Sequence, residues 1–538
     1  MPDDPSWPTV DGDEVDREPP TVQVRRPEPA TMRIPAPVRA TPVRVPPKPA
    51  APPPPVPPTE IKSEPEPVPE PITEREDPPP PAGRRKRPFV LGAAALLVVA
   101  LAGTAVVGSQ QGWFDTTPAP TTAAPLPPAP VSLSVKGVGA DGTPPTAAGV
   151  RSVLAGPAAN ALLAPLTGVV VDPATGTALW NQGETAPQTP ASTIKILTAA
   201  AALLTLDHTS QFSTKVVRGS QPGSVVLVGG GDPTLSSLPA GQTTVYPGAA
   251  TIDDLAAQVR AAGGPVTQVL YDVSRYAGPG TAPGWHPDDV PGGYVAPIEP
   301  VMLDGGREDP TKDEVRRTST PAAVAAQALA QRLGVPAVAA GAAAPGAEVL
   351  GEVKSVPVDR LVENLMQISD NVLAETVARE VAKARGLEPS FAGAAQAVRD
   401  VLTEHGFDLS TATIVDGSGL SPNDKVPAKL LADVLAAAAK PDASDPRTAK
   451  LRPLLTALPV AGGSGTLAGR YEQWGAGGRG WVRAKTGTLT AVNTLAGVVV
   501  DADGRLLVFA FMSFNAGETA KVRGALDELA AALRSCGC

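Results

Sequence analysis

The sequence of 538 residues is poor in the side chains that bind metals, with only two cysteines and three histidines. Cys536 and Cys538 are too few for a four-ligand zinc site or a disulfide framework. No histidines stand in H-x-x-x-H or H-E-x-x-H spacing, and no G-x-x-x-x-G-K-[ST] phosphate loop occurs. We therefore expect no metal site and no cofactor, and a chemistry carried by Ser, Lys, Asp or Glu side chains.

Positive charge is also scarce, with 45 Lys and Arg against 54 Asp and Glu and a net charge of −9. This balance argues against a nucleic-acid binder, which needs a basic surface. The one dense basic run, residues 84–87, directly precedes residues 88–108, which carry no charge. A helix of that length spans about 30 Å, the thickness of a bilayer core. The sequence thus predicts a single-pass membrane anchor at 88–108.

The basic run also predicts the orientation of this anchor. By the positive-inside rule, residues 1–87 lie in the cytoplasm and residues 109–538 lie outside the membrane. A cleaved signal peptide is the alternative, but a stretch of 87 preceding residues is far longer than a usual n-region.

Proline marks two segments that are unsuited to building a core. Of the 64 prolines, 27 fall in residues 1–87, which predicts a disordered tail. Such a tail could dock into aromatic grooves of a cytoplasmic partner, or it could be a simple spacer. Residues 109–149 are rich in Pro, Thr and Ala and predict an extended linker.

Globular sequence begins at residue 150 and predicts an α+β fold. A β-hairpin is expected over 167–180, followed by a buried helix from Ser192 to Leu204. Short strands, Gly/Pro turns and two amphipathic helices between 207 and 351 indicate an inserted domain. A β-meander over 482–513 ends the fold with a last helix. The predicted parts are 150–206, 207–351 and 352–538.

The first candidate for chemistry is Ser192-Thr-Ile-Lys195. At a spacing of three residues on a helix, the two side chains share a face. Ser192 would be a nucleophile if Lys195 took its proton, which requires a neutral amine. Apolar burial and a second cation such as Lys485 would both favour that neutral form. Alone the pattern is common, and its alternative reading is a capping serine beside a surface lysine.

The second candidate is Ser369-Asp-Asn371, in a break between two helical stretches. Ser369 could relay a proton to a leaving amine, and Asn371 could hold a substrate amide. A helix break with an N-cap explains the same residues on local grounds. Ser421-Pro-Asn423 has the same S-x-N form, but its proline and Gly-rich surroundings favour a turn.

The third candidate is Lys485-Thr-Gly-Thr488 at the end of a predicted strand. Lys485 and Thr486 could bind a substrate carboxylate by charge and hydroxyl. Gly487 would let a substrate backbone approach closely, and the amide of Thr488 would be an oxyanion donor. A strand-edge lysine beside a loop is the alternative. The three patterns occur in the order that is typical of penicillin-recognising serine enzymes.

Together these motifs resemble the D-alanyl-D-alanine carboxypeptidase/endopeptidase family, the class C low-molecular-mass penicillin-binding proteins. The resemblance covers residues 150–534. It rests on Pro190–Lys195, Gly229–Leu235, Ser369–Glu375, Asp416–Ser421 and Gly465–Leu467. It implies a transpeptidase/β-lactamase-like domain, an antiparallel sheet flanked by helices with a helical subdomain. It also implies an inserted domain between the S-x-x-K and S-x-N motifs.

The resemblance further implies a mechanism and partners. Ser192 would attack the terminal D-Ala-D-Ala bond of a peptidoglycan stem peptide, with Lys195 as general base. Ser369 and Lys485 would pass the proton to the departing D-alanine, and water would resolve the acyl-enzyme. β-Lactams would acylate Ser192 as covalent inhibitors. The activity would be that of a carboxypeptidase, with an endopeptidase activity as a further possibility.

Two other functions remain open at this stage. A membrane-anchored β-lactamase would need a deacylating base, for which Glu375, Glu380 and Glu388 are candidates. A non-catalytic sensor of β-lactams or the cell wall would be acylated and signal through the Pro-rich tail.

Overall fold

The computed structural model describes residues 142–442 and 445–537. The predicted tail 1–87 and membrane span 88–108 lie outside these residues, as does most of the predicted linker 109–149. None of the described helices combines the length and apolar character that a membrane crossing needs. The linker was predicted too long at its C-terminal end, because helix α2 (Ala147–Ala158) begins there, with the Thr146 side chain as its N-cap.

The central sheet is antiparallel throughout, with strand order β10-β11-β12-β1-β2. Strand β1 pairs with β12, so that Leu166 lies opposite Ser513. The predicted hairpin near the start of the domain and the predicted meander near its end therefore form one sheet. Its strands are β1 (Leu166–Asp172), β2 (Thr177–Gln182), β10 (Val482–Leu489), β11 (Val492–Val500) and β12 (Leu506–Ser513).

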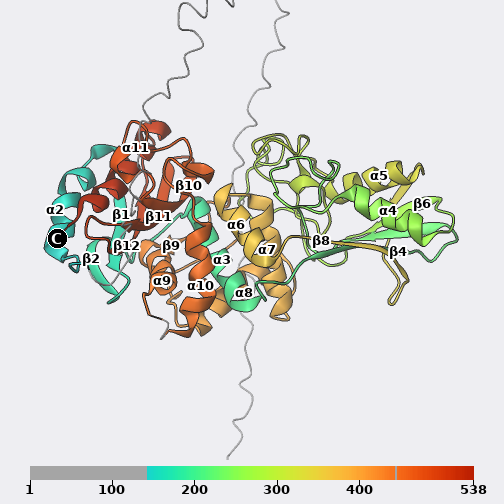
Figure 1. Ribbon diagram of the computed structural model, residues 1–538, viewed down its shortest axis with the longest axis horizontal. Coiled ribbons are helices and arrows are strands. Elements are labelled where there is room, and N and C mark those ends of the chain that lie inside the picture. Colours follow the sequence, from blue (N-terminus) through green and yellow to red (C-terminus); the bar gives the residue numbers. More distant parts are fainter. Residues whose placement is uncertain (1–141, 443–444, 538) are drawn as a thin grey trace, which may run out of the picture. The chain divides into compact units, whose positions relative to one another are not determined.

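Both faces of this sheet are covered by helices, as Figure 1 shows. Strand β12 is buried on both sides because its side chains alternate between two cores. Leu507, Phe509 and Phe511 pack with α2 and α11 (Thr519–Ala532). Val508, Ala510 and Met512 pack with the other helical layer.

This second layer is an all-helical half built around α3. Helix α3 is almost entirely buried because it consists mainly of alanine and leucine. Helices α6 and α7 are separated at residues 368–370, the predicted break. The helices are α3 (Lys195–Thr205), α6 (Val358–Gln367), α7 (Asn371–Ala384), α8 (Phe391–Glu404), α9 (Ala428–Ala439) and α10 (Pro446–Ala457). Two short strands, β3 (Pro187–Gln188) and β9 (Val426–Pro427), pair beside it.

A second five-stranded sheet lies between α3 and α6 in the sequence, with order β7-β6-β5-β4-β8. Its β5-β6 and β6-β7 pairs are parallel, and its other pairs are antiparallel. Helices α4 (Ile252–Ala262) and α5 (Pro321–Leu333) bury their apolar faces in the same core. The strands are β4 (Ser213–Arg218), β5 (Ser224–Val228), β6 (Gln268–Asp272), β7 (Ala337–Ala340) and β8 (Val349–Lys354).

Between β6 and α5 the chain runs through a long segment, residues 273–320, that contains only the short 3-10 helix η3 (Asp304–Gly306). Several residues of this segment line the cleft described below. The other 3-10 helices are η1 (Ala161–Leu163), η2 (Ala191–Ile194), η4 (Gly465–Leu467), η5 (Ala476–Gly478) and η6 (Leu533–Ser535).

Candidate active site

Ser192 lies in the 3-10 helix η2, and the α-helix α3 begins only at Lys195. The prediction that the α-helix starts at Ser192 is therefore wrong by three residues. Hydrogen bonds hold this turn tightly: Thr193 Oγ1 donates to the Pro190 carbonyl at 2.7 Å, and Thr494 Oγ1 of β11 donates to the same carbonyl at 2.8 Å. The Thr494 contact ties the turn that carries Ser192 to strand β11 of the central sheet.

Lys195 is fully buried directly behind Ser192. Its Nζ lies 2.9 Å from Ser192 Oγ, and it donates to Asn371 Oδ1 at 2.7 Å and to the Ser418 carbonyl at 2.6 Å. A neutral amine has two N–H donors and one lone pair. The two carbonyl-type oxygens use both donors, so the lone pair faces the Ser192 hydroxyl. This is the arrangement that a general base for Ser192 requires.

Burial also favours the neutral form of Lys195. Loss of hydration lowers the pKa of this amine to about 8, although the carboxylates of Asp416 and Glu375 oppose the shift. A part of the Lys195 population is therefore unprotonated near neutral pH, which meets the requirement stated for an activated serine.

Ser369 and Asn371 occupy the break between α6 and α7. Ser369 adopts a left-handed backbone conformation with φ of +59°, and its Oγ accepts a hydrogen bond from Lys485 Nζ at 2.8 Å. Asn371 links Lys195 to the segment 273–320, because its Nδ2 donates to the Tyr294 carbonyl at 3.0 Å. The structure brings Ser192, Ser369 and Asn371 to one cleft.

The competing S-x-N motif at residues 421–423 is part of the packed structure and lies outside the cleft. Ser421 is buried, and its Oγ donates to the Pro283 carbonyl at 2.8 Å. Neither Ser421 nor Asn423 lines the cleft that contains Ser192. The choice of residues 369–371 over 421–423 agrees with this geometry.

The position of Lys485 fits its predicted partnership with Ser369 but not its predicted grip on a carboxylate. It is fully buried, and its Nζ donates to Ser369 Oγ at 2.8 Å and to the Thr486 carbonyl at 2.9 Å. Burial, followed by the charge of Lys195, holds the pKa of Lys485 well below its ordinary value. A direct grip of Lys485 on a substrate carboxylate does not fit this geometry, because the amine is turned toward Ser369 beneath the cleft.

The requirement for glycine at position 487 also has a different cause from the predicted one. A Cβ at this position would lie 2.2 Å from Thr494 Oγ1, 2.7 Å from the Pro190 carbonyl oxygen and 3.0 Å from the Ser192 nitrogen. The space beside Gly487 is thus filled by the protein itself and not by substrate. The glycine lets β10 lie directly against the turn that carries Ser192.

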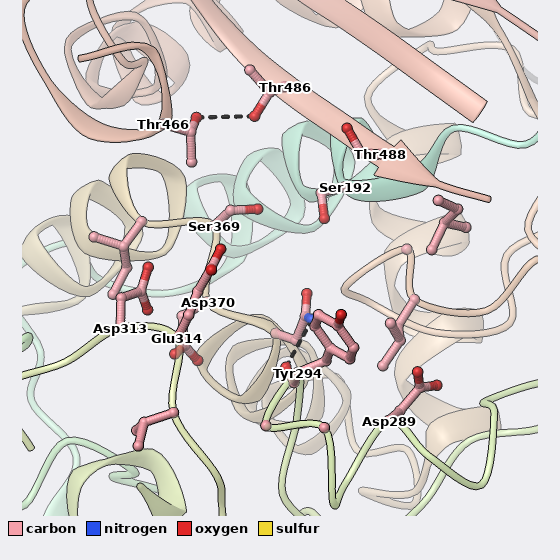
Figure 2. Close-up of a pocket in the computed structure, with 18 of the residues that line it drawn as sticks. Ser192, Asp289, Tyr294, Asp313, Glu314, Ser369, Asp370, Thr466, Thr486 and Thr488 are labelled. Atoms are coloured by element: carbon pink, nitrogen blue, oxygen red, sulfur yellow. Dashed lines mark hydrogen bonds between the residues drawn. The ribbon is translucent and has the colours of Figure 1, made fainter. Parts of the chain in front are cut away.

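Thr486 and Thr488 share the opposite face of β10, since alternate residues of a strand point the same way. Both line the cleft, and Thr486 Oγ1 lies 2.9 Å from Thr466 Oγ1 in a hydrogen bond. Figure 2 shows these threonines with Ser192 and Ser369 along one side of the cleft. This side therefore presents a row of hydroxyl groups.

The opposite side of the cleft comes from the segment 273–320, as the labelled Asp289, Tyr294, Asp313 and Glu314 in Figure 2 show. The cleft has a volume of about 890 Å³. This volume lies within the range of ligand pockets, roughly 300–1,000 Å³.

Asp370, the middle residue of its motif, joins the two sides. It is fully buried and accepts hydrogen bonds from Arg307 Nη2 at 2.6 Å, Arg317 Nη2 at 3.2 Å and Tyr246 OH at 3.1 Å. Burial alone would raise the pKa of Asp370, but the two guanidinium groups outweigh it and hold the pKa well below its ordinary value. We call Asp370, Arg307, Arg317 and Tyr246 the arginine clamp.

Glu375 supports the loop that positions Lys195. Its carboxylate accepts hydrogen bonds from the amides of Gly417, at 2.9 and 3.0 Å, and Ser418, at 2.8 Å. The Ser418 carbonyl in turn accepts from Lys195. Burial and the neighbouring Asp416 raise the pKa of Glu375 to about 8.

None of the three glutamates considered as deacylating bases lines the cleft. Glu375 faces the loop, Glu380 accepts from Arg275 Nε at 2.8 Å and Tyr276 OH at 2.9 Å, and Glu388 is exposed elsewhere. Within residues 142–442 and 445–537, no group of three His, Cys, Asp or Glu side chains is arranged to hold a metal ion.

Comparison with known proteins now gives the family. The model of the D-Ala-D-Ala carboxypeptidase 3 (S13) family matches residues 148–314 and 307–533. The chain belongs to this family. The predicted activity, that of a serine-type D-Ala-D-Ala carboxypeptidase, is confirmed at the level of the family.

Two curated carboxypeptidases match most of the chain. Carboxypeptidase DacB of Mycolicibacterium smegmatis is 47% identical over 465 residues, which are 85% of this chain and 98% of the relative. A carboxypeptidase of Mycobacterium tuberculosis is 46% identical over 464 residues, again 85% of this chain and 98% of the relative. The crystal structure of penicillin binding protein 4 of Haemophilus influenzae covers 72% of this chain and 97% of its own, with a TM-score of 0.58 at 21% identity. This likeness confirms the predicted fold class.

The sequence did not reveal several residues of this S13 site. Arg307, Arg317 and Tyr294 come from the segment 273–320, and Arg523 comes from α11. Thr466 was noted only as part of a family motif. No local pattern marks these residues, because each reaches the cleft through the tertiary fold.

Proposed function

We propose that this carboxypeptidase removes the terminal D-alanine of peptidoglycan stem peptides through an acyl-enzyme on Ser192. Ser192 Oγ attacks the carbonyl carbon of the penultimate D-alanine while Lys195 accepts the hydroxyl proton. The C–N bond breaks, and Ser369 and Lys485 pass the proton that Lys195 accepted on to the departing amine. Water then hydrolyses the ester and restores Ser192.

The oxyanion that forms during this attack needs two donors. The amides of Ser192 and Thr488 are our candidates. The close approach of β10 to Ser192 supports this choice, since a Cβ built on Gly487 would lie only 3.0 Å from the Ser192 nitrogen. Asn371 would hold the substrate amide, and Thr486 and Thr488 would donate their hydroxyls to the terminal carboxylate.

The observation that carries the proposal is the geometry of Lys195, buried behind Ser192 with its donors already occupied. The test is the intact mass of the protein after treatment with penicillin. The wild type should gain the mass of one penicillin, and Ser192→Ala should gain none. Adduct formation on the Ser192→Ala variant would refute the assignment of the nucleophile.

The same apparatus would be acylated by β-lactams, which present a strained amide and a nearby carboxylate. A membrane-anchored β-lactamase remains the alternative function. The placement of Glu375, Glu380 and Glu388 away from the cleft favours a slow deacylation of the β-lactam adduct. A chromogenic cephalosporin separates the two, because a β-lactamase shows many turnovers and a carboxypeptidase forms a lasting one-to-one adduct.

We further propose that residues 88–108 anchor the protein in the bacterial membrane, with residues 1–87 in the cytoplasm and the enzyme outside. The basic run at 84–87 and the external position of peptidoglycan support this orientation. Protease treatment of intact spheroplasts should degrade the catalytic part and spare the tail. A non-catalytic sensor that signals through this tail, with a tail-binding cytoplasmic partner, is the other alternative. Deletion of residues 1–80 tests it, because unchanged peptidase activity in membranes would weaken the sensor function.

A further inference from the structure

The substrate of the proposed function carries a carboxylate next to the bond that is cut, and this charge needs a partner in the cleft. Lys485 is unsuited to this role. It is fully buried, and its Nζ is engaged by Ser369 Oγ and the Thr486 carbonyl. The cation that attracts the carboxylate must therefore come from another residue of the cleft wall.

Arg523 has the required position. It lies on α11, where that helix passes the end of β10, and it lines the same cleft as Ser192. Its Nε and Nη2 donate to Thr488 Oγ1 at 3.3 and 3.1 Å. The guanidinium thus contacts the hydroxyl row at the end where a substrate carboxylate would meet Thr486 and Thr488.

Arg523 and Thr488 do not use all of their hydrogen-bond donors on each other, and the unused donors suit a carboxylate. A guanidinium has five N–H donors, of which Thr488 engages two. The Thr488 hydroxyl accepts from Arg523, and its own O–H proton remains available to a second acceptor. A carboxylate with two oxygens can accept from the remaining guanidinium donors and from this hydroxyl together.

On the Thr488 side of the cleft, the neighbouring Arg470 is neutralised, which leaves Arg523, whereas Arg316 belongs to the opposite segment 273–320. Arg470 donates from Nη2 to Asp527 Oδ1 at 2.7 Å and from Nε to Asp527 Oδ2 at 3.0 Å. Within the described residues Arg523 forms no ion pair at salt-bridge distance, although Glu314 on the opposite side of the cleft and Asp527 on its own helix attract it from further away. Arg523 is therefore a cation on the Thr488 side that is open to an anionic ligand.

We propose that Arg523 binds the carboxylate of the leaving D-amino acid, together with the Thr486 and Thr488 hydroxyls, and so determines specificity for substrates with a free carboxyl terminus. Lys485 then serves proton transfer through Ser369. This inference rests on the proposed function and assigns its charge recognition to a residue outside the three motifs.

The test compares a peptide that ends in D-Ala-D-Ala with the same peptide as its C-terminal amide, using the full-length protein. Arg523→Gln should lower kcat/KM for the acid by about 10- to 100-fold, the loss expected for a hydrogen bond to a charged group. The amide should be affected much less. Arg523→Lys should restore a part of the preference for the acid. The matched control is Lys521→Gln, which removes a cation of the same helix that pairs with Glu518 at 2.8 Å, and it should behave as the wild type.

A thioester of an N-acyl-D-alanine whose leaving group has no carboxylate separates the possible failures. If the wild type cleaves neither the peptide nor the thioester, the proposed function fails, and this inference fails with it. If the wild type cleaves both and Arg523→Gln lowers acid, amide and thioester by one common factor, Arg523 only supports the strand end and the inference alone is overturned. If the ratio of kcat/KM for the acid to kcat/KM for the amide is the same in Arg523→Gln as in the wild type, the inference about Arg523 is likewise overturned.

Discussion

At the scale of single residues, the site is governed by two buried amines that cannot both carry a full charge. Lys195 and Lys485 are each fully buried, and the charge of Lys195 lowers the pKa of Lys485. Four carboxylates raise the pKa of Lys195 but do not offset its loss of hydration. The two lysines therefore act on the two ends of one reaction, with Lys195 at the Ser192 hydroxyl and Lys485 at the Ser369 hydroxyl.

The first prediction concerns pH. The pKa of Lys195 is lowered to about 8, and only the unprotonated amine above that pKa can accept the Ser192 proton. Acylation by a β-lactam should therefore speed up as pH rises through about 8. Lys195→Ala should lower the acylation rate by about 10²- to 10⁴-fold and abolish this pH dependence. Stopped-flow fluorescence with a labelled penicillin measures both. A wild-type rate that is flat from acid to alkaline pH would contradict the assignment.

The second prediction concerns Gly487. Gly487→Ala places a Cβ against Thr494, Pro190 and the Ser192 nitrogen, so either β10 or the nucleophile turn must shift. We expect a loss of about 1–3 kcal/mol in the free energy of unfolding, as for overpacked sites, together with slower acylation. Gly477→Ala is the matched control, because nothing lies within 4 Å of a Cβ built there. Urea unfolding and penicillin labelling report the two effects. Equal behaviour of the two variants would show that β10 can move away freely.

At the scale of elements, the arginine clamp attaches the segment 273–320 to the N-terminus of α7. Asp370 does two things at once: its Oδ1 caps α7 through the Leu373 amide at 2.7 Å, and its Oδ2 accepts from both arginines. Asn371 follows it directly and contacts Tyr294 in the same segment. The far wall of the cleft thus depends on the residue between Ser369 and Asn371.

The third prediction tests this clamp. Asp370→Asn keeps a side-chain oxygen for the cap but leaves Arg307 and Arg317 without this buried charge, which should cost about 3 kcal/mol of unfolding free energy. Asp254→Asn, at an exposed position in the first turn of α4, is the control and should change stability by less than about 0.5 kcal/mol.

The pH dependence of this difference has a defined sign. The folded pKa of Asp370 lies below its ordinary value of 3.8, so its contribution is present above that pH and is lost as pH falls further. The difference in unfolding free energy between wild type and Asp370→Asn should therefore be constant above pH 4 and become smaller below it. A gap that grows on acidification would contradict the clamp.

Elements with a local signal could be predicted from the sequence. The hairpin predicted over 167–180 corresponds to β1 and β2, and the meander predicted over 482–513 corresponds to β10, β11 and β12, because hydrophobic periodicity and flanking turns mark them. The S-x-x-K, S-x-N and K-T-G patterns likewise identified the side chains that meet around Ser192.

The remaining features depend on contacts between distant segments and could not be predicted in this way. The direction of Lys485 and the steric role of Gly487 follow from how β10 lies against η2. Arg317 and Arg523 enter the site because the segment 273–320 and α11 fold back to it. The spacing of residues in the sequence does not indicate which distant segments come into contact.

At the scale of the whole molecule, the described part of the chain contains every residue of the proposed site. Ser192 comes from the first segment of the domain, Ser369 and Asn371 from the helical half, and Thr486 and Thr488 from the last strands, while the segment 273–320 closes the other side. All of these groups lie at positions after residue 142. Catalysis and attachment to a membrane should therefore be separable.

The fourth prediction tests this separation with a protein that begins at residue 142. All hydrogen bonds of Ser192, Lys195, Ser369 and Lys485 named above lie within this part, so its second-order rate of acylation by penicillin should equal that of the full-length protein. Its hydrolysis of a soluble D-Ala-D-Ala peptide should also be unchanged.

In cells, however, the shortened protein carrying a cleavable export signal should appear in the soluble fraction, because it lacks the uncharged residues 88–108. Sedimentation of membranes followed by penicillin labelling measures both properties. Continued sedimentation with membranes would place the attachment in the catalytic part, whereas a fall in acylation would show that the N-terminal residues support the site.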